Sequence, residues 1–224
     1  MGPDDATECM VFSHGFGVGR DSRGMFTDLV EQLSDKYLCI LFEYTRVESD
    51  ATHVDSYQTM LWTLMRVIEH VQEQYAPRSI HLVAHSMGCL LAASQSIQFH
   101  KQIYLAPATE PLSERLKNHF KQNPNTVIDA LGNVSAKRSD GSTTQISRRF
   151  FDELQPVIPM DQYAMTNGEV MVVEAAEDEI VTNHTQQWGV FGNISVMSIS
   201  GDHNFKPPYR AQLVQTVLDY FEHE

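Results

Sequence analysis

The sequence predicts an α/β fold with one mostly parallel central sheet, and three observations support this prediction. Short apolar segments bounded by glycine, proline or polar residues alternate with longer segments of helical periodicity. The apolar segments are rich in Val, Ile and Leu without strict polar alternation, which is typical of strands buried on both faces. A length of 224 residues is that of one sizeable domain built on such a sheet.

The alternating pattern predicts six strands and five helices. Because crossover helices cover a parallel sheet, we expect helices on both of its faces. The predicted helix over residues 56–75 has the clearest apolar stripe, which indicates packing against the sheet. The predicted strands are 9–13, 37–44, 79–84, 102–105, 169–175 and 194–200. The predicted helices are 23–34, 56–75, 88–99, 184–189 and 209–223.

Residues 110–167 interrupt this alternation. The segment is far longer than the usual connection of about 2 to 6 residues, so we predict a small lid inserted into a single domain that spans residues 1–224. Within it, residues 112–121 and 147–154 have helical patterns, and Asp140-Gly141 indicates a hairpin. A lid of this kind shapes a substrate pocket and excludes water from it.

Composition excludes several classes of partner. The formal net charge is −13, and nucleic-acid binding requires clustered Lys and Arg, so we expect no nucleic-acid partner. No apolar run approaches the roughly 20 residues of a membrane-spanning helix, which predicts no membrane insertion. Three cysteines, Cys9, Cys39 and Cys89, form no CxxC pair and indicate reduced thiols in the cytoplasm. His81 and His85 are four residues apart, but on a predicted strand; we expect no metal and no other cofactor.

The segment Ala84-His85-Ser86-Met87-Gly88 connects a predicted strand to a predicted helix. This is the context of a nucleophilic serine on a strained turn whose neighbours must be small. Ser86 is therefore the candidate nucleophile, and Gly88 keeps one side of the turn open. Ala84 stands where the motif usually has its first glycine, and His85 is a supporting residue.

A second glycine-rich loop, His14-Gly15-Phe16-Gly17, follows the first predicted strand. Main-chain amides in such a loop can point at a developing oxyanion. We predict that the amides of Phe16 and Met87 form the oxyanion hole, with His14, Gly15 and Gly17 as supporting residues. A phosphate-binding interpretation of the loop is weaker because Arg20 occupies the position of the third glycine in GxGxxG.

The candidate base is His203, in the segment Gly201–Phe205 after the last predicted strand. In this type of site the acid lies between the serine and the histidine along the chain. Asp178 fits because it follows the strand over 169–175 in a turn that returns to the core at Ile180 and Val181.

Three other carboxylates compete with Asp178 for the role of the acid. Glu177 and Glu179 flank it, and we expect both to point to solvent. Glu110, after the predicted strand over 102–105, is the second candidate.

Together these four motifs resemble the α/β-hydrolase superfamily over almost the whole chain. Within it the chain is similar to small serine carboxylesterases, including cinnamoyl or feruloyl esterases and monoacylglycerol lipases. The resemblance implies a serine hydrolase that cleaves small-molecule carboxylic esters through an acyl-enzyme intermediate. An acyltransferase, a thioesterase or a carbon–carbon bond hydrolase would use the same triad, and a non-catalytic ligand-binding relative is a further alternative.

Two departures from the family pattern affect these expectations. The first two strands of the family sheet are missing, which leaves a minimal α/β-hydrolase sheet of about six strands. The exposed sheet edge that results allows a homodimer. The GHGxS segment of many relatives is also absent after Phe42-Glu43-Tyr44, which weakens assignment to any particular subfamily. The sequence does not specify the acyl chain length of the substrate.

Overall fold

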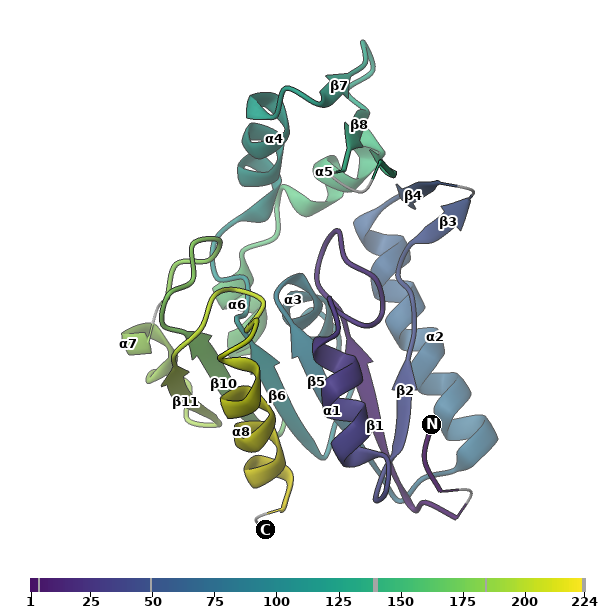
Figure 1. Cartoon of the computed structure of the whole chain (residues 1–224), viewed down its shortest axis with the longest axis vertical. Helices are drawn as coiled ribbons and strands as arrows, with labels where there is room; N and C mark the ends of the chain where they lie inside the picture. Colours follow the sequence, from purple (N-terminus) through teal and green to yellow (C-terminus); the bar gives the residue numbers. More distant parts are fainter. Residues whose placement is uncertain (4, 49, 139–140, 184, 223–224) are drawn as a thin grey trace.

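The computed structural model describes residues 1–3, 5–48, 50–138, 141–183 and 185–222. Figure 1 shows a central sheet flanked by helices, with a smaller group of elements beyond one end of it. The sheet has six strands in the order β11-β10-β6-β5-β1-β2, and each neighbouring pair is parallel. The predicted parallel sheet of about six strands is confirmed. Its strands are β1 (Glu8–Ser13), β2 (Leu38–Leu41), β5 (Ser79–His85), β6 (Lys101–Leu105), β10 (Glu169–Ala175) and β11 (Ile194–Ile199).

Helices cover both faces of the sheet, as expected. On one face, α1 (Met25–Leu33) and α8 (Arg210–Glu222) pack in one apolar cluster with Met10 and Phe12 of β1. On the other face, Cys9 and Val11 of the same strand join a second cluster. Both sets of β1 side chains are buried, which explains the lack of polar alternation in the sequence. The second cluster includes residues of α2 (Tyr57–Tyr75), α3 (Met87–Ala93), α6 (Pro159–Ala164) and α7 (Thr185–Trp188).

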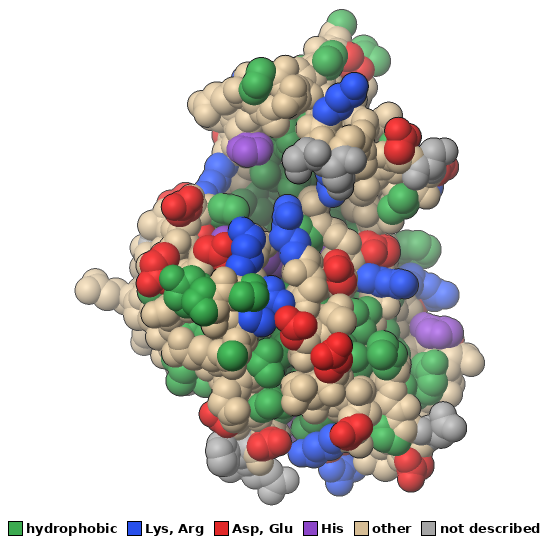
Figure 2. All heavy atoms as spheres, viewed as in Figure 1, with side chains coloured by type: hydrophobic (Ala, Val, Ile, Leu, Met, Phe, Trp, Pro, Cys, Tyr) green, Lys and Arg blue, Asp and Glu red, His purple; other side chains and the backbone are tan. Residues whose placement is uncertain are grey.

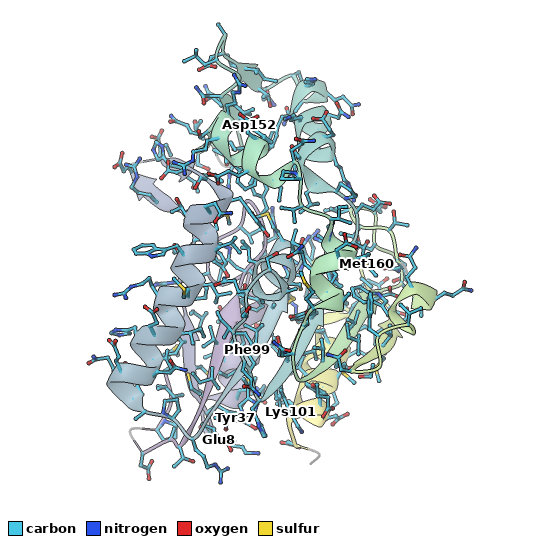
Figure 3. All side chains as sticks on the ribbon, turned by 180° about the vertical axis from the view of Figure 1, so that it is seen from behind. Glu8, Tyr37, Phe99, Lys101, Asp152 and Met160 are labelled. Carbon is cyan, nitrogen blue, oxygen red and sulfur yellow. The ribbon has the colours of Figure 1, made fainter. Side chains whose placement is uncertain are left out.

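The long helix α2 shows how local sequence fixes an element. Its first turn is capped by the Ser56 hydroxyl, which accepts a hydrogen bond from the Thr59 amide. It ends at Ala76, which has a left-handed backbone with φ of 43°. Buried residues recur at helical spacing along one face, so replacing Leu64 with alanine would cost about 2 to 5 kcal/mol of stability. Figure 3 shows α2 and α6, with the label Met160, on this face.

The segment 110–167 contains helices and strands. The predicted helices within it are present as α4 (Leu112–Gln122) and α5 (Arg148–Leu154). Three strands follow α4: β7 (Thr126–Ile128), β8 (Val134–Lys137) and β9 (Thr143–Ile146). The antiparallel β8–β9 pair flanks the predicted hairpin at Asp140-Gly141, of which Asp140 lies outside the described residues.

The sequence interpretation missed a second sheet. Two short strands, β3 (Arg46–Glu48) and β4 (Ala51–Val54), join those of the lid in the order β3-β4-β9-β8-β7. Strands of three or four residues carry too little periodicity to be recognised alone. Their pairing is also non-local, since β4 lies parallel to β9 with Ala51 opposite Thr143.

Several predicted boundaries were wrong. The predicted strand over 37–44 is ordered as β2 only to Leu41, and the predicted helix over 88–99 ends at Ala93. The helix stops where Ser94 and Ser96 follow, because short polar side chains compete for main-chain hydrogen bonds. Of the predicted helices over 184–189 and 209–223, residues His184 and His223 lie outside the described residues.

Candidate active site

Ser86 occupies a one-residue turn between β5 and α3. Its backbone has φ of 54° and ψ of −121°, an unusual conformation for a residue other than glycine. The turn is held by the Ser86 amide, which donates to the Leu105 carbonyl over 2.9 Å. In the other direction the Ser86 carbonyl accepts from the Cys89 amide over 3.1 Å. Such strain is stable only where the surrounding structure fixes it, and it leaves the hydroxyl partly exposed.

Gly88 is required by the close approach of another chain segment. A Cβ at this position would lie 2.2 Å from the Ser13 carbonyl oxygen and 2.7 Å from that of His14. Gly15 is also crowded, since a Cβ there would lie 3.1 Å from the Cβ of Ser86. The glycines of the two motifs therefore let the loop after β1 pack directly against the serine turn.

Ser86, His203 and Asp178 form a chain of hydrogen bonds. The His203 Nε2 lies 3.0 Å from the Ser86 Oγ, and its Nδ1 lies 2.8 Å from the Asp178 Oδ2. A carboxylate can only accept, so Nδ1 carries the ring proton and Nε2 presents a lone pair to the serine hydroxyl. This is the tautomer that a general base needs.

Asp178 is fixed by two further hydrogen bonds. Its Oδ1 accepts from the amides of Ile180 and Val181, each over 2.8 Å, and its side chain has no exposed surface. Burial alone would raise the pKa of this carboxyl group, but the hydrogen bond and charge of His203 and the two amides outweigh it. The net result is a pKa below the ordinary value, which keeps Asp178 ionised.

The three other candidates for the acid, Glu110, Glu177 and Glu179, have different surroundings. Glu110 forms an ion pair with Arg115, with 3.4 Å between its Oε2 and the Arg115 Nη1. Glu179 is exposed, as predicted. Glu177 corrects the expectation of a purely solvent-facing side chain, because its carboxylate accepts a hydrogen bond from the Gly201 amide. That contact holds the loop that leads to His203.

The two predicted oxyanion donors lie beside the serine. Met87 is the first residue of α3, where an amide has no acceptor within its own helix. The Phe16 amide donates to no main-chain acceptor within the described part of the chain. Both residues line the same pocket as Ser86 and His203. Their role as oxyanion donors stays a prediction.

The buried ring of His14 organises the loop that contains Phe16. The Nε2 accepts from the Tyr44 amide over 3.2 Å, so Nδ1 carries the proton and donates to the Gly15 carbonyl over 2.9 Å. The ring thus connects the loop to the segment after β2. Both nitrogens contact the main chain, and Nε2 also lies 3.4 Å from the Glu43 Oε2, so the ring is held on both sides.

His85 connects three segments of the site. Its Nε2 lies 2.9 Å from the main-chain carbonyl of His203, and its Nδ1 lies 3.0 Å from the Ser22 hydroxyl. Because a carbonyl only accepts, Nε2 donates and Nδ1 accepts from Ser22. Burial, aided by the nearby His203, lowers the pKa of His85 to about 3, so the ring is neutral. Sequence reasoning identified His85 only as a supporting residue and missed Ser22.

A family model described as the alpha/beta hydrolase family matches residues 10–216. The chain belongs to this family. The α/β-hydrolase fold predicted from the four motifs is thereby confirmed.

Solved structures agree with this assignment. Est1E from Butyrivibrio proteoclasticus superposes with a TM-score of 0.68 at 15% identity, covering 98% of this chain and 88% of that one. A further structure shows Est1E with bound ferulic acid. The esterase domain of a Rhodothermus marinus protein gives a TM-score of 0.66 at 18% identity, over 99% and 87% of the two chains.

The Paleococcus ferrophilus monoacylglycerol lipase gives a TM-score of 0.64 at 14% identity, over 94% of this chain and 92% of that one. Among curated protein sequences, none matches this chain significantly. At these identities the structural likeness shows the fold alone.

The pocket of this α/β hydrolase is small and mostly apolar. It has a volume of about 160 Å³ and contains Ser86 and His203 in its wall. Two arginines, Arg23 and Arg115, also line it, and neither was singled out from the sequence. Figure 2 shows Lys and Arg side chains beside the hollow between the lid and the central sheet. The apolar wall consists mainly of Phe16, Val18, Leu112, Leu116, Ile180 and Val181.

Aromatic side chains of the lid pack against Phe16 in the loop after β1. The Phe16 ring stacks on Phe150 with 5.4 Å between centroids and meets the edge of Phe120 at 6.3 Å. Phe120, Phe150 and Phe151 are buried in the lid, and Tyr163 is buried beneath it in the core. None of the four lines the described pocket, so they serve as packing rather than as a surface for substrate.

Within the described residues, no group of three or more His, Cys, Asp or Glu side chains could hold a metal ion. Cys9, Cys39 and Cys89 are buried free thiols, and burial raises the pKa of Cys9 to about 12 and that of Cys39 to about 11. No helix in the described ranges is long and apolar enough to cross a membrane.

Proposed function

We propose that this α/β hydrolase is a serine esterase that cleaves small-molecule carboxylic esters through an acyl-enzyme intermediate. The observation behind the proposal is the unbroken hydrogen-bond chain from Asp178 through His203 to Ser86 at the wall of a pocket. We treat the chain as one domain over residues 1–224, with the lid at about 110–167 as its cover. No step requires a cofactor.

In the first half-reaction, the Ser86 Oγ attacks the ester carbonyl carbon while its proton moves to the His203 Nε2. The carbonyl oxygen becomes an oxyanion, which the amides of Phe16 and Met87 stabilise by hydrogen bonds. When the intermediate collapses, the carbon–oxygen bond to the alcohol breaks, and His203 returns the proton to the leaving oxygen. Ser86 then carries the acyl group as an ester.

In the second half-reaction, His203 takes a proton from water as the water attacks the acyl-enzyme. The second tetrahedral oxyanion uses the same two amides, and its collapse releases the acid and restores the Ser86 hydroxyl. Asp178 stays ionised throughout and stabilises the positively charged imidazole. The buried network around His85 holds the His203 backbone in place during both proton transfers.

The similar solved structures favour esters over other bonds. One is named as an esterase domain and another as a monoacylglycerol lipase, and both cover most of this chain. An acyltransferase or a thioesterase would use the same residues and differ only in the acceptor or the leaving atom. Ligand binding without catalysis would not require the strained Ser86 turn or the oriented His203 tautomer.

The central experiment measures hydrolysis of p-nitrophenyl esters from acetyl to palmitoyl by wild type, Ser86→Ala and Ser198→Ala. Ser198 is an exposed serine on β11 and is the matched control. Removing Ser86 should lower kcat by a factor on the order of 10⁶, as loss of the nucleophile does in other serine hydrolases. Ser198→Ala should behave as wild type. Equal activity in wild type and Ser86→Ala would reject the proposed nucleophile.

Two further measurements separate the alternatives. A fluorophosphonate should add its phosphonyl mass to wild type but not to Ser86→Ala, which tests the nucleophile without any choice of substrate. Product analysis with added alcohols and with thioester substrates then distinguishes hydrolysis from acyl transfer and thioester cleavage. Labelling without any turnover would favour an acyltransferase whose acceptor is missing from the assay.

A further inference from the structure

The wall of the pocket at Ser86 contains two arginines, and of these Arg115 pairs with Glu110, which lies outside the wall. Arg23 and Arg115 both line it, and within the described residues no Asp or Glu does. The whole chain has 29 acidic and 16 basic residues, so a random sample of its surface would contain more carboxylates than guanidinium groups. The excess of positive charge is therefore local to the pocket.

The position of Arg23 is set by its backbone conformation and not by a hydrogen bond or ion pair of its side chain. It follows Ser22 in a run of left-handed residues, with φ of 46° at Ser22 and 58° at Arg23. The Ser22 hydroxyl is fixed by the buried His85 ring. The Arg23 side chain makes no hydrogen bond or ion pair with any residue in the described ranges. A guanidinium in this state at a pocket wall is available to a ligand.

Arg115 reaches the same pocket from the lid helix α4. Its contact with Glu110 is a single long approach of 3.4 Å between two partly exposed side chains, which contributes little. The two arginines thus come from different parts of the fold, one from the loop after β1 and the other from α4. Figure 1 shows these segments as separate elements. An anion bound by both Arg23 and Arg115 would connect the lid to the loop after β1.

The size of the pocket limits what else the ligand contains. At about 160 Å³ the pocket is well below the roughly 300 to 1,000 Å³ of sites for drug-sized molecules. A long fatty chain would not be enclosed by such a volume and would extend beyond it. A short chain that ends in a charged group does, and the planar fork of a guanidinium matches a carboxylate or a phosphate.

We propose that the substrate is a short ester that carries an anionic group, a carboxylate or a phosphate, which Arg23 and Arg115 bind beside the reacting carbonyl. This inference rests on the proposed esterase function and narrows its substrate class. The arginines act as specificity-determining residues, and the chemistry at Ser86 is the same for neutral esters.

The test uses ester pairs that differ only in charge. Mono-p-nitrophenyl glutarate and its methyl ester place the charge on the acyl side. The pair 4-acetoxybenzoate and methyl 4-acetoxybenzoate places it on the alcohol side, and 4-acetoxyphenyl phosphate replaces the carboxylate with a phosphate. Each kcat/KM is divided by the rate of hydroxide hydrolysis of the same ester, which removes differences in intrinsic reactivity.

Wild type should prefer the anionic member of at least one pair by about 10- to 100-fold, the range expected for one charge-assisted contact. Arg23→Gln and Arg115→Gln should each lower the ratio of kcat/KM for the anionic ester to kcat/KM for its neutral partner. Arg66→Gln is the control, since Arg66 is an exposed residue of α2 paired with Glu69. Added salt should also weaken the preference.

The outcomes separate this inference from the proposed function. Ser86-dependent hydrolysis with equal rates for both members of every pair would reject the anion site and keep the esterase. A preference that survives both arginine substitutions would also reject it. Where no ester is hydrolysed, the esterase proposal fails, and calorimetry of 4-acetoxybenzoate with Ser86→Ala and Ser86→Ala/Arg23→Gln still tests the anion site. Binding lost in the double variant supports the site, and equal or absent binding rejects it.

Discussion

The buried ring of His85 donates a hydrogen bond from its Nε2 to the main-chain carbonyl of His203, 2.9 Å away. Residue 85 directly precedes the proposed nucleophile, and residue 203 is the proposed base. Thus one neutral side chain ties the strand that positions the serine to the loop that positions the imidazole. The other ring nitrogen accepts from Ser22 and extends the connection to the loop that carries Phe16.

We expect His85→Phe to impair catalysis more than substrate binding. The substitution leaves the His203 carbonyl and the Ser22 hydroxyl buried without partners, at about 1 to 3 kcal/mol each. A displacement of His203 by about 1 Å can cost on the order of 100-fold in rate. Kinetics with a neutral ester should therefore show a fall in kcat with little change in KM, and the melting temperature should drop.

The matched control for His85→Phe is Ser22→Ala. It removes one partner of the ring but keeps the bond to the His203 carbonyl, so it should lower stability while retaining most of kcat. Equal kcat values for wild type and His85→Phe would show that the loop around His203 holds its position unaided.

Asp178→Asn tests the identity of the acid. An asparagine can donate to the His203 Nδ1, which favours the tautomer with its proton on Nε2 and leaves no lone pair for the Ser86 hydroxyl. We expect kcat to fall by about 10⁴-fold, as in other triads with this change. Glu179→Gln, an exposed neighbour, should have no effect. Full activity in Asp178→Asn together with its loss in Glu110→Gln would transfer the role to Glu110.

The residues of the proposed triad could be found from the sequence because their signals are local. Ser86 is marked by an apolar strand, small neighbours and a following helix within about a dozen residues. His203 and Asp178 are each marked by a position directly after a recognisable strand. Strand ends of a parallel sheet meet at one edge, so chain order and periodicity were enough to predict that these residues lie near one another.

Other parts of the site could not be predicted in this way. Ser22 and Arg23 adopt left-handed backbones although neither is glycine, and no sequence rule marks such residues. Arg115 lines the pocket only because α4 presents that face, which depends on how the lid packs. The second sheet pairs Ala51 with Thr143, and its short strands become recognisable only when the distant partner is known.

Gly88→Ala should disrupt both the fold and the activity. The added methyl group would lie 2.2 Å from the Ser13 carbonyl oxygen, and neither main-chain segment can move without disturbing the serine turn. We expect a loss of about 1 to 3 kcal/mol or more in the free energy of unfolding, measured by urea denaturation. Gly192→Ala is the control, because a methyl group at that position would have nothing within 4 Å of it in the described part of the chain. Similar stabilities for the two variants would contradict the close approach at Gly88.

At the opposite end of β5, His81 should make stability depend on pH. Figure 3 labels Glu8, Tyr37 and Lys101 at this end of the sheet, away from the lid. Burial lowers the pKa of His81 to about 4, although the nearby Glu8 opposes the shift. The Nε2 of His81 lies 3.7 Å from the Glu8 Oε2, whereas its Nδ1 has no hydrogen-bond partner among the described residues, so no hydrogen bond at Nδ1 offsets the cost of burying the charged ring.

Between about pH 4 and 6.5 the unfolded chain therefore binds a proton at His81 that the folded chain does not. Stability must rise with pH across this window and be lost as the pH falls from 6.5 towards 4. The difference between the two pKa values corresponds to about 3 kcal/mol. His81→Phe keeps a ring against Tyr37 and Phe221 but removes the titrating group, so its unfolding free energy should vary less with pH.

The measurement is urea unfolding of wild type and His81→Phe at several pH values from about 4 to 7. The difference curve reports His81 together with its effect on Glu8, whose pKa the nearby His81 helps to lower, while His85 and the other carboxylates titrate in both proteins. His70→Gln, a change at an exposed histidine of α2, should give a curve parallel to that of wild type. Parallel curves for wild type and His81→Phe would mean that His81 takes up its proton equally in the folded and unfolded chains.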